Sequence, residues 1–192
     1  MTKATIFGDG NMGTAIAGIL TEGGATVEHI TTTDQGEATV IGDLVILAVP
    51  YPALDAITAA YGDQLTGKVV VDITNPLDFE TFDSLTVPAG SSATAELAAK
   101  LPSSRVLKAF NTTFAATLAS KTVGDNPTTV LVAGDDAEAK TTLIDAVTAG
   151  GVQAIDAGGL NRAHELEALG FLQLTLAAAE KTSWAGGFAL VR

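Results

Sequence analysis

The chain contains no cysteine and few basic residues. Its 192 residues include 10 lysines and arginines against 22 acidic residues, which gives a net charge of −12. The lack of cysteine excludes disulfides, thiolate catalysis and thiolate metal ligands, and we predict no metal site. A strongly acidic protein repels nucleic acid and anionic membrane surfaces, so neither is expected as a partner.

Long apolar runs are also missing. A membrane span needs about 18 consecutive apolar residues, and the sequence has no such run. Hydrophobic residues still make up 47% of the chain and charged residues only 17%, which excludes disorder. The N-terminus enters a strand-like run instead of a basic, apolar leader, so we expect a cytoplasmic protein. The length suits a single domain over residues 1–192.

Strand-like and helical patterns alternate along the chain. Runs of β-branched and apolar residues predict strands over 3–8, 25–31, 43–49, 68–73, 105–110, 128–133 and 151–156. Helical spacing falls over 12–20, 53–61, 93–101, 113–120, 136–149 and 160–181. This order predicts an α/β fold, a Rossmann-like doubly wound and mostly parallel sheet, with a C-terminal helix and tail over 160–192.

Two connections depart from the alternation. The polar stretch after the second strand, residues 31–39, is too short for an ordinary crossover helix. Residues 76–92 follow neither period and are predicted to form a long loop, of the kind that often lines a site.

A complete G-x-G-x-x-G pattern follows the first predicted strand, in the order Gly8, Asp9, Gly10, Asn11, Met12, Gly13. In dinucleotide sites the first glycine makes the tight turn and the second lets the backbone approach a pyrophosphate. The third allows close packing of helix on strand. We therefore expect a dinucleotide site, with a turn used only for packing as the alternative.

The second strand ends at Thr31-Thr32-Thr33 instead of at a carboxylate. Hydroxyls can donate to the 2′-phosphate of NADP, whereas NAD sites usually carry an acidic residue here, so the pattern favours NADP. No lysine or arginine occurs between Lys3 and Lys68, which leaves His29 as the nearby candidate cation or as an ordinary strand residue. Asp34 lies close by in sequence. NAD therefore stays possible.

Six segments fall in the order seen in one known family: the glycine pattern, then 47–50, 71–77, 108–112, 134–136 and 156–160. On these residues the chain resembles the coenzyme F420-dependent NADP reductases over nearly its whole length. The same fold resembles the cytosolic domain of the six-transmembrane metalloreductases, which pass NADPH electrons to a flavin.

The resemblance implies direct hydride transfer between nicotinamide and a deazaflavin, by positioning alone and without a catalytic acid or base. It implies that Gly8 to Gly13 contact the pyrophosphate and that Thr31 and Thr32 contact the 2′-phosphate. Val49 and Pro50 are then expected on the nicotinamide-ribose side, and Asn75 and Pro76 beside the reacting ring. Asn111 and Thr112 belong to the segment that is expected to meet the deazaflavin. The tail 186–188 is expected to fold back near the nicotinamide. The family's arginine beside the 2′-phosphate is missing here, which leaves the choice between NADP and NAD open.

The basic side chains and one histidine late in the chain have two interpretations each. Lys108 and Arg162 are candidates to contact an anionic acceptor, or they are ion-pair partners. His164 is a candidate proton donor, or it lies at the surface.

We therefore predict an NAD(P)H-dependent oxidoreductase that uses coenzyme F420 or a flavin-like small molecule as co-substrate. Two alternatives stay open: flavin-mediated reduction of a ferric or other small molecule, and a dinucleotide-binding module without turnover.

The last predicted helix is apolar over more than one face, with leucines at 166, 169, 172, 174 and 176 and a phenylalanine at 171. Such a helix predicts a homodimer, with burial inside one subunit as the alternative.

Overall fold

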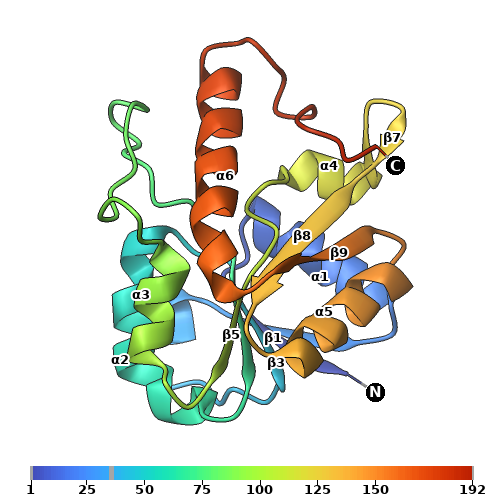
Figure 1. The fold of residues 1–192 in the computed structure, drawn as a ribbon. Coiled ribbons are helices and arrows are strands. Elements are labelled where there is room, and N and C mark those ends of the chain that lie inside the picture. The colour runs from blue at the N-terminus through green and yellow to red at the C-terminus, as the bar shows by residue number, and fades with distance from the viewer. Residues whose placement is uncertain (1, 35–36, 192) are drawn as a thin grey trace.

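A seven-stranded sheet with helices on both faces forms the centre of the protein (Figure 1). The computed structural model describes residues 2–34 and 37–191. The strand order is β2-β1-β3-β4-β5-β8-β9, and all neighbouring pairs are parallel except β5 and β8. The strands are β1 (Lys3–Phe7), β2 (Thr26–Ile30), β3 (Leu44–Leu47), β4 (Val69–Asp72), β5 (Arg105–Lys108), β8 (Thr129–Gly134) and β9 (Gln153–Gly158). The predicted Rossmann-like, mostly parallel α/β fold is confirmed.

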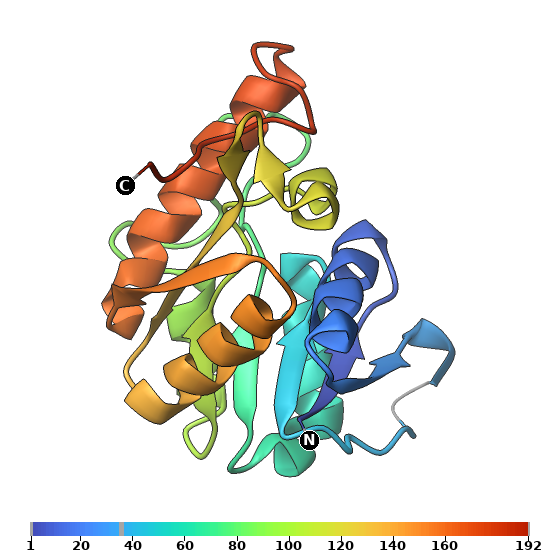
Figure 2. The ribbon, with the colours of Figure 1, turned by 90° about the vertical axis from the view of Figure 1, so that its right-hand side faces the viewer.

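The helices cover the two faces of this sheet in separate groups (Figures 1 and 2). Helices α2 and α3 pack on one face, and α1 and α5 pack on the other. The helices are α1 (Asn11–Glu22), α2 (Leu54–Leu65), α3 (Ala93–Lys100), α4 (Ala115–Ser120), α5 (Ala137–Ala149) and α6 (Ala163–Ala178). Short 3-10 turns occur at η1 (Thr32–Asp34), η2 (Tyr51–Ala53) and η3 (Leu160–Arg162).

The central strands are buried on both faces, which explains their nearly continuous apolar sequences. Every residue of β3 and β4 is buried. Side chains alternate between the two cores: Ile46 packs with α1 and α5, whereas Val45 and Leu47 pack with α2 and α3. The sheet thus lies between two apolar layers, and the loops that follow the parallel strands begin at its carboxyl edge.

The last part of the sheet differs from the sequence prediction. Helix α4 is followed by a small hairpin, β6 (Thr122–Val123) and β7 (Asn126–Pro127), which the pattern of apolar runs does not reveal. The hairpin returns the chain so that β8 runs antiparallel to β5. This one antiparallel pair agrees with the prediction of a mostly parallel sheet, although the sequence pattern did not indicate which strand is reversed.

The two irregular connections are largely as expected. The link after β2 holds only the 3-10 turn η1 among its described residues, and residues 35 and 36 of this link lie outside the described part of the chain. The segment between β4 and α3 has no helix within it and contains one isolated bridge, Leu77 with Leu85.

Helix α6 begins beside β5 and rises beyond the body of the sheet, and the C-terminal tail then turns back (Figure 1). Its first half is held by buried contacts, whereas Leu172 in its second half is 48% exposed. Within residues 2–34 and 37–191, no helix is both long enough and apolar enough to cross a membrane.

Candidate functional site

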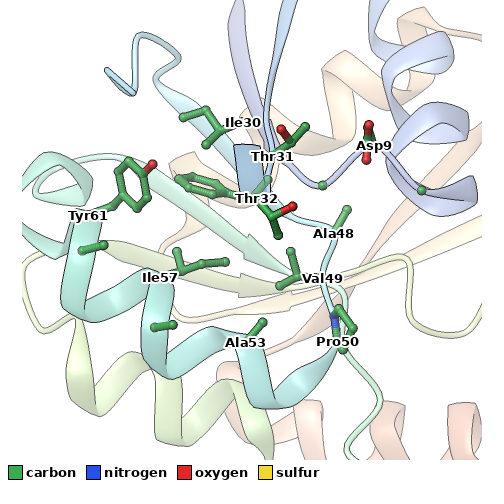
Figure 3. Close-up of a pocket in the computed structure, with 15 residues that line it drawn as sticks. Asp9, Ile30, Thr31, Thr32, Ala48, Val49, Pro50, Ala53, Ile57 and Tyr61 are labelled. Carbon is green, nitrogen blue, oxygen red and sulfur yellow. The ribbon is translucent and has the colours of Figure 1, made fainter. Parts of the chain in front are cut away.

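A largely apolar cavity of about 570 Å³ lies at the carboxyl ends of β1, β2 and β3 (Figure 3). Its walls come from the glycine turn, the ends of β2 and β3, and one side of α2. The lining residues are Phe7, Gly8, Asp9, Gly10, Ile30, Thr31, Thr32, Ala48, Val49, Pro50, Ala53, Ala56, Ile57, Ala60 and Tyr61. Seven of the predicted site residues therefore share one cavity: Gly8, Asp9, Gly10, Thr31, Thr32, Val49 and Pro50.

The glycine turn has three glycines with three different surroundings. Gly8 has a φ of +98°, and a Cβ there would lie 2.4 Å from the Ala48 carbonyl oxygen. A Cβ at Gly13 would lie 2.4 Å from the Gly8 carbonyl oxygen. These two positions require glycine for the fold. A Cβ at Gly10 would meet nothing within 4 Å, so this position keeps space open beside the cavity.

The start of α1 offers backbone amides to an anion. Gly10 is the N-cap and has no side chain to cap the helix, and the first turn contains no acidic residue. The first amides of a helix, here those of Asn11, Met12 and Gly13, lack partners within the helix, and they carry the positive end of its dipole. Open space beside Gly10 and uncapped amides fit the pyrophosphate of a dinucleotide.

Helix α2 and the end of the turn η2 before it supply an apolar wall opposite the glycine turn (Figure 3). Ala53, Ala56 and Ala60 leave room because their side chains are small. Tyr61 closes the far end and contacts Phe7 edge to face, with ring centroids 4.9 Å apart. A planar, largely apolar group such as adenine suits this wall. None of these α2 and η2 residues was predicted as part of the site, although small residues at helical spacing are a local pattern that indicates such a wall.

The threonines at the end of β2 differ in their hydrogen bonding. The Thr31 backbone N–H donates to Asp34 Oδ2 at 2.6 Å, and its hydroxyl donates to the same oxygen at 3.1 Å. The Thr32 hydroxyl has no partner within the described residues and is exposed beside the cavity. His29 Nδ1 lies 2.9 Å from the Gly8 carbonyl oxygen, so this ring helps to hold the glycine turn. One of the two threonines is therefore already engaged within the protein.

The predicted residues at the ends of β4 and β5 lie outside the cavity lining. Asn111 Nδ2 donates to Asn75 Oδ1 at 2.9 Å and to the Leu166 carbonyl at 2.8 Å, and Asn75 Nδ2 donates to the Asn111 carbonyl at 2.9 Å. Pro76 and Thr112, the residues that follow this pair, are buried. The four residues thus form a second group, in which the two amides bind each other.

Gly170 of α6 packs directly on this asparagine pair. A Cβ at Gly170 would lie 2.3 Å from Asn75 Oδ1 and 2.9 Å from Asn111 Nδ2. The close approach fixes α6 against the ends of β4 and β5.

A buried ion cluster lies beneath the asparagine pair. Lys108 Nζ is 2.9 Å from Asp72 Oδ2, 2.9 Å from Glu167 Oε1 and 2.7 Å from the Thr74 carbonyl oxygen. The side chains of Lys108, Asp72 and Glu167 are at most 1% exposed. Glu167 also accepts a hydrogen bond from the first amide of α3, that of Ala93, at 2.9 Å. Lys108 is thus an ion-pair partner, and it cannot reach an acceptor.

Arg162 and His164, the other two late candidates, also have structural partners, as does Tyr51, which was not predicted as a site residue. Arg162 NH1 pairs with Glu165 at 3.0 Å, and His164 Nδ1 lies 3.0 Å from the Ser91 carbonyl oxygen. The Tyr51 hydroxyl donates to Glu96 Oε2 at 2.6 Å, and burial together with this carboxylate raises the pKa of Tyr51, so the phenol stays protonated. Among the described residues, no three His, Asp or Glu side chains gather as a metal site would need.

The C-terminal tail folds back along α6. The Phe188 amide donates to Gln173 Oε1 at 3.1 Å, and Trp184 contacts Phe114 with ring centroids 5.1 Å apart. Phe114 ends the segment after β5 that contains Asn111 and Thr112. The tail is therefore close to the second group of predicted residues.

Comparisons with known proteins point to one family. Residues 25–76 match the model of the coenzyme F420-dependent NADP oxidoreductases. The chain is 36% identical over 134 residues to the F420-dependent NADP reductase of Methanocaldococcus jannaschii, an alignment that covers 67% of this chain and 59% of that protein. It is also 36% identical over 107 residues to the rat metalloreductase STEAP3, covering 56% of this chain and 21% of that protein. The chain thus spans less than two thirds of either relative.

A solved structure matches the whole chain. The crystal structure of a proposed F420-dependent NADP reductase from Arthrobacter superposes with a TM-score of 0.85 and 25% identity, and all of both chains is covered. Sequence and fold together therefore relate this chain to the F420-dependent NADP reductases, as the order of its motifs predicted.

Proposed function

We propose that this protein is an NAD(P)H-dependent oxidoreductase that transfers hydride between nicotinamide and coenzyme F420 or a flavin-like acceptor. The observation that carries the proposal is the glycine turn, which leaves open space at Gly10 and faces an apolar cavity of about 570 Å³. The similarity to the archaeal reductase supports the reaction type.

In this proposal the chain binds a dinucleotide along the carboxyl edge of the sheet. The wall of α2 takes the adenine, and the amides at the start of α1 take the pyrophosphate. Val49 and Pro50, at the end of β3, direct the nicotinamide toward β4 and β5, because β3 lies between β1 and β4 in the sheet. When bound, the nicotinamide supplies or receives the hydride.

The chain contributes position to this reaction, and we assign it no catalytic acid or base. Holding two reactants at near-attack distance lowers a barrier by about 7–11 kcal/mol. The bond from Lys108 Nζ to the Thr74 carbonyl fixes the backbone directly before Asn75 and Pro76. The asparagine pair then fixes the end of β5 against the same point. We propose that this rigid corner, with Asn111 and Thr112, borders the reacting ring.

Binding and turnover assays test the proposal. NADPH and NADH are titrated calorimetrically, and the reduced nucleotide is then mixed without oxygen with the deazaflavin, with FMN or with FAD while the visible absorbance is followed. Bleaching of the deazaflavin or of a flavin supports hydride transfer and identifies the acceptor. Bleaching of the flavins alone would, in addition, favour the second candidate, in which the reduced flavin passes its electrons to a ferric or other small molecule, as the similarity to the rat metalloreductase suggests. Nucleotide binding without transfer to any of the three supports a module without turnover.

We also propose that two copies pair through α6. Helix α6 and the tail that follows it keep an apolar surface outside their own subunit, since Leu172 of the helix and Trp184 and Phe188 of the tail are 48%, 51% and 47% exposed. A second copy of this surface would cover these side chains.

A further inference from the structure

Asp34 follows the end of the second strand, where a nucleotide-binding sheet reads the adenosine ribose, and it lies behind the cavity lining. It belongs to the turn η1 that directly follows β2, and it binds both the amide and the hydroxyl of Thr31. Thr31 and Thr32 line the cavity between Asp9 of the glycine turn and the apolar residues of α2 (Figure 3). The Asp34 carboxylate is therefore hydrogen-bonded directly to Thr31, a lining residue on the side of the cavity where the ribose is expected.

Among the described residues, no hydrogen bond or ion pair joins this carboxylate to a lysine, arginine or histidine. The sequence has no lysine or arginine between Lys3 and Lys68. Lys68 Nζ donates to the Gly42 carbonyl at 2.7 Å, and Gly42 precedes β3 at the opposite edge of the sheet. Lys3 begins β1 at that same opposite edge. His29 directs one ring nitrogen to the Gly8 carbonyl at 2.9 Å.

We propose that Asp34 sets the nucleotide preference of the cavity by disfavouring a 2′-phosphate, so that the protein binds NADH as well as NADPH. The inference rests on the proposed dinucleotide site. A carboxylate at the end of the second strand accepts a hydrogen bond from a free ribose hydroxyl, and it repels a phosphate dianion. The Thr32 hydroxyl is the available donor to a 2′-phosphate, and the Asp34 charge opposes its effect.

The variant Asp34→Asn tests this role. Asparagine keeps an oxygen that can accept the Thr31 N–H, so the turn retains its hydrogen bond while the negative charge is removed. Calorimetry gives the dissociation constants of NADPH and NADH for the wild type and the variant. We expect the preference for NADPH over NADH to rise about tenfold, the effect of removing one charge from the vicinity of a doubly charged group in nearly aqueous surroundings. NADH affinity should change less than about threefold.

A matched control is Asp9→Asn, which removes a carboxylate from the pyrophosphate side of the same cavity. Both nucleotides carry the pyrophosphate, so this variant should change both affinities by the same factor and leave their ratio unchanged. Asp34→Ser serves as a second test, because it also removes the charge and keeps a hydroxyl acceptor. Thermal unfolding of each variant checks that the fold is kept.

Salt gives an independent readout. In the wild type, added salt screens the repulsion, so the preference for NADPH should increase with ionic strength. A cationic phosphate site shows the opposite trend. The Asp34→Asn variant should show a weaker dependence than the wild type.

The outcomes separate this inference from the proposed function. If neither nucleotide binds the wild type, the dinucleotide site itself is wrong. If both bind, and folded Asp34→Asn and Asp34→Ser leave the ratio unchanged, the site stands and Asp34 has no part in the choice. If the preference for NADPH over NADH also rises in Asp9→Asn, the overall charge of the cavity, and not the position of Asp34, sets the preference, and the proposal is overturned.

Discussion

Substitution of Gly10 by valine should abolish dinucleotide binding and keep the fold. Gly10 has φ −67° and ψ −175°, an extended conformation that valine adopts readily. A Cβ at this position meets nothing within 4 Å, so no protein atom has to move. The loss of folding stability should be no more than about 1 kcal/mol, since valine is a poorer N-cap than glycine.

The binding loss comes from the space that the valine methyls occupy. They would stand in front of the first amides of α1, those of Asn11 and Met12, and keep a phosphate from reaching them. A hydrogen bond to a charged acceptor contributes about 1.5–3 kcal/mol, so losing two weakens binding by about 3–6 kcal/mol. This range corresponds to a loss in affinity of about a hundredfold to ten-thousandfold.

Calorimetric titration with NADPH and NADH measures this loss directly. Gly18→Val is the matched control, because Gly18 lies on the exposed side of the same helix and a Cβ there also meets nothing within 4 Å. This control should bind both nucleotides like the wild type. Unchanged affinity in a folded Gly10→Val variant would refute the assignment of the glycine turn to the pyrophosphate.

Four further predictions concern the pocket, the ion cluster, the dimer and acid stability. Thr32→Ala should weaken NADPH binding by about 1.5–3 kcal/mol in calorimetry and leave NADH nearly unaffected; equal losses would exclude a contact with the 2′-phosphate. Lys108→Met should lower the free energy of unfolding in urea by about 3–5 kcal/mol, because two buried carboxylates lose their ammonium partner; a loss below about 1 kcal/mol would contradict this view of the cluster. Light scattering should give twice the 19.4 kDa of one chain for the wild type and a single-chain mass for Leu172→Glu, and a wild-type mass of one chain would remove the dimer. Hydrogen bonds from Lys140 and from the Gly158 amide lower the pKa of Asp156 below its ordinary value of 3.8. The contribution of the Asp156 carboxylate to folding stability is therefore complete above pH 3.8, and it is lost as the pH falls through the lower pKa of the folded state. Urea unfolding of Asp156→Asn and the wild type should therefore differ near pH 6 and converge toward pH 2, and a constant difference would show that the carboxylate charge is not responsible.

The fold was predictable where a signal is local and strong. The apolar run at 43–49 became β3 (Leu44–Leu47), which is buried on both sides, and the glycine pattern became the turn before α1. The reversal at β8 was not predictable, because it depends on a hairpin whose strands β6 and β7 have two residues each. Segments this short carry no period for a pattern to reveal.

The site shows the same division between local and long-range signals. The glycine turn and the threonines after β2 were predicted from neighbouring residues, and they line one cavity. The interaction of Asn75 with Asn111 joins residues 36 positions apart, and Asn111 also binds Leu166, a further 55 positions along. Their engagement with each other and with α6 could not be read from either motif alone. The position of the Asp34 carboxylate could not be predicted either, because only its bond to Thr31 shows where it points.

The close contact at Gly170 has a consequence for how relatives of this protein can differ. With 2.3 Å between a hypothetical Cβ and Asn75 Oδ1, even alanine at position 170 would collide with the asparagine pair. A Cβ there would also lie 2.9 Å from the Asn111 backbone carbonyl oxygen, so a larger residue requires α6 to shift outward even if the side chain at 75 becomes shorter. Position 170 should therefore vary together with positions 75 and 111 across an alignment, and a relative with a bulky residue at the first position and asparagines at the other two should hold its last helix farther from the sheet.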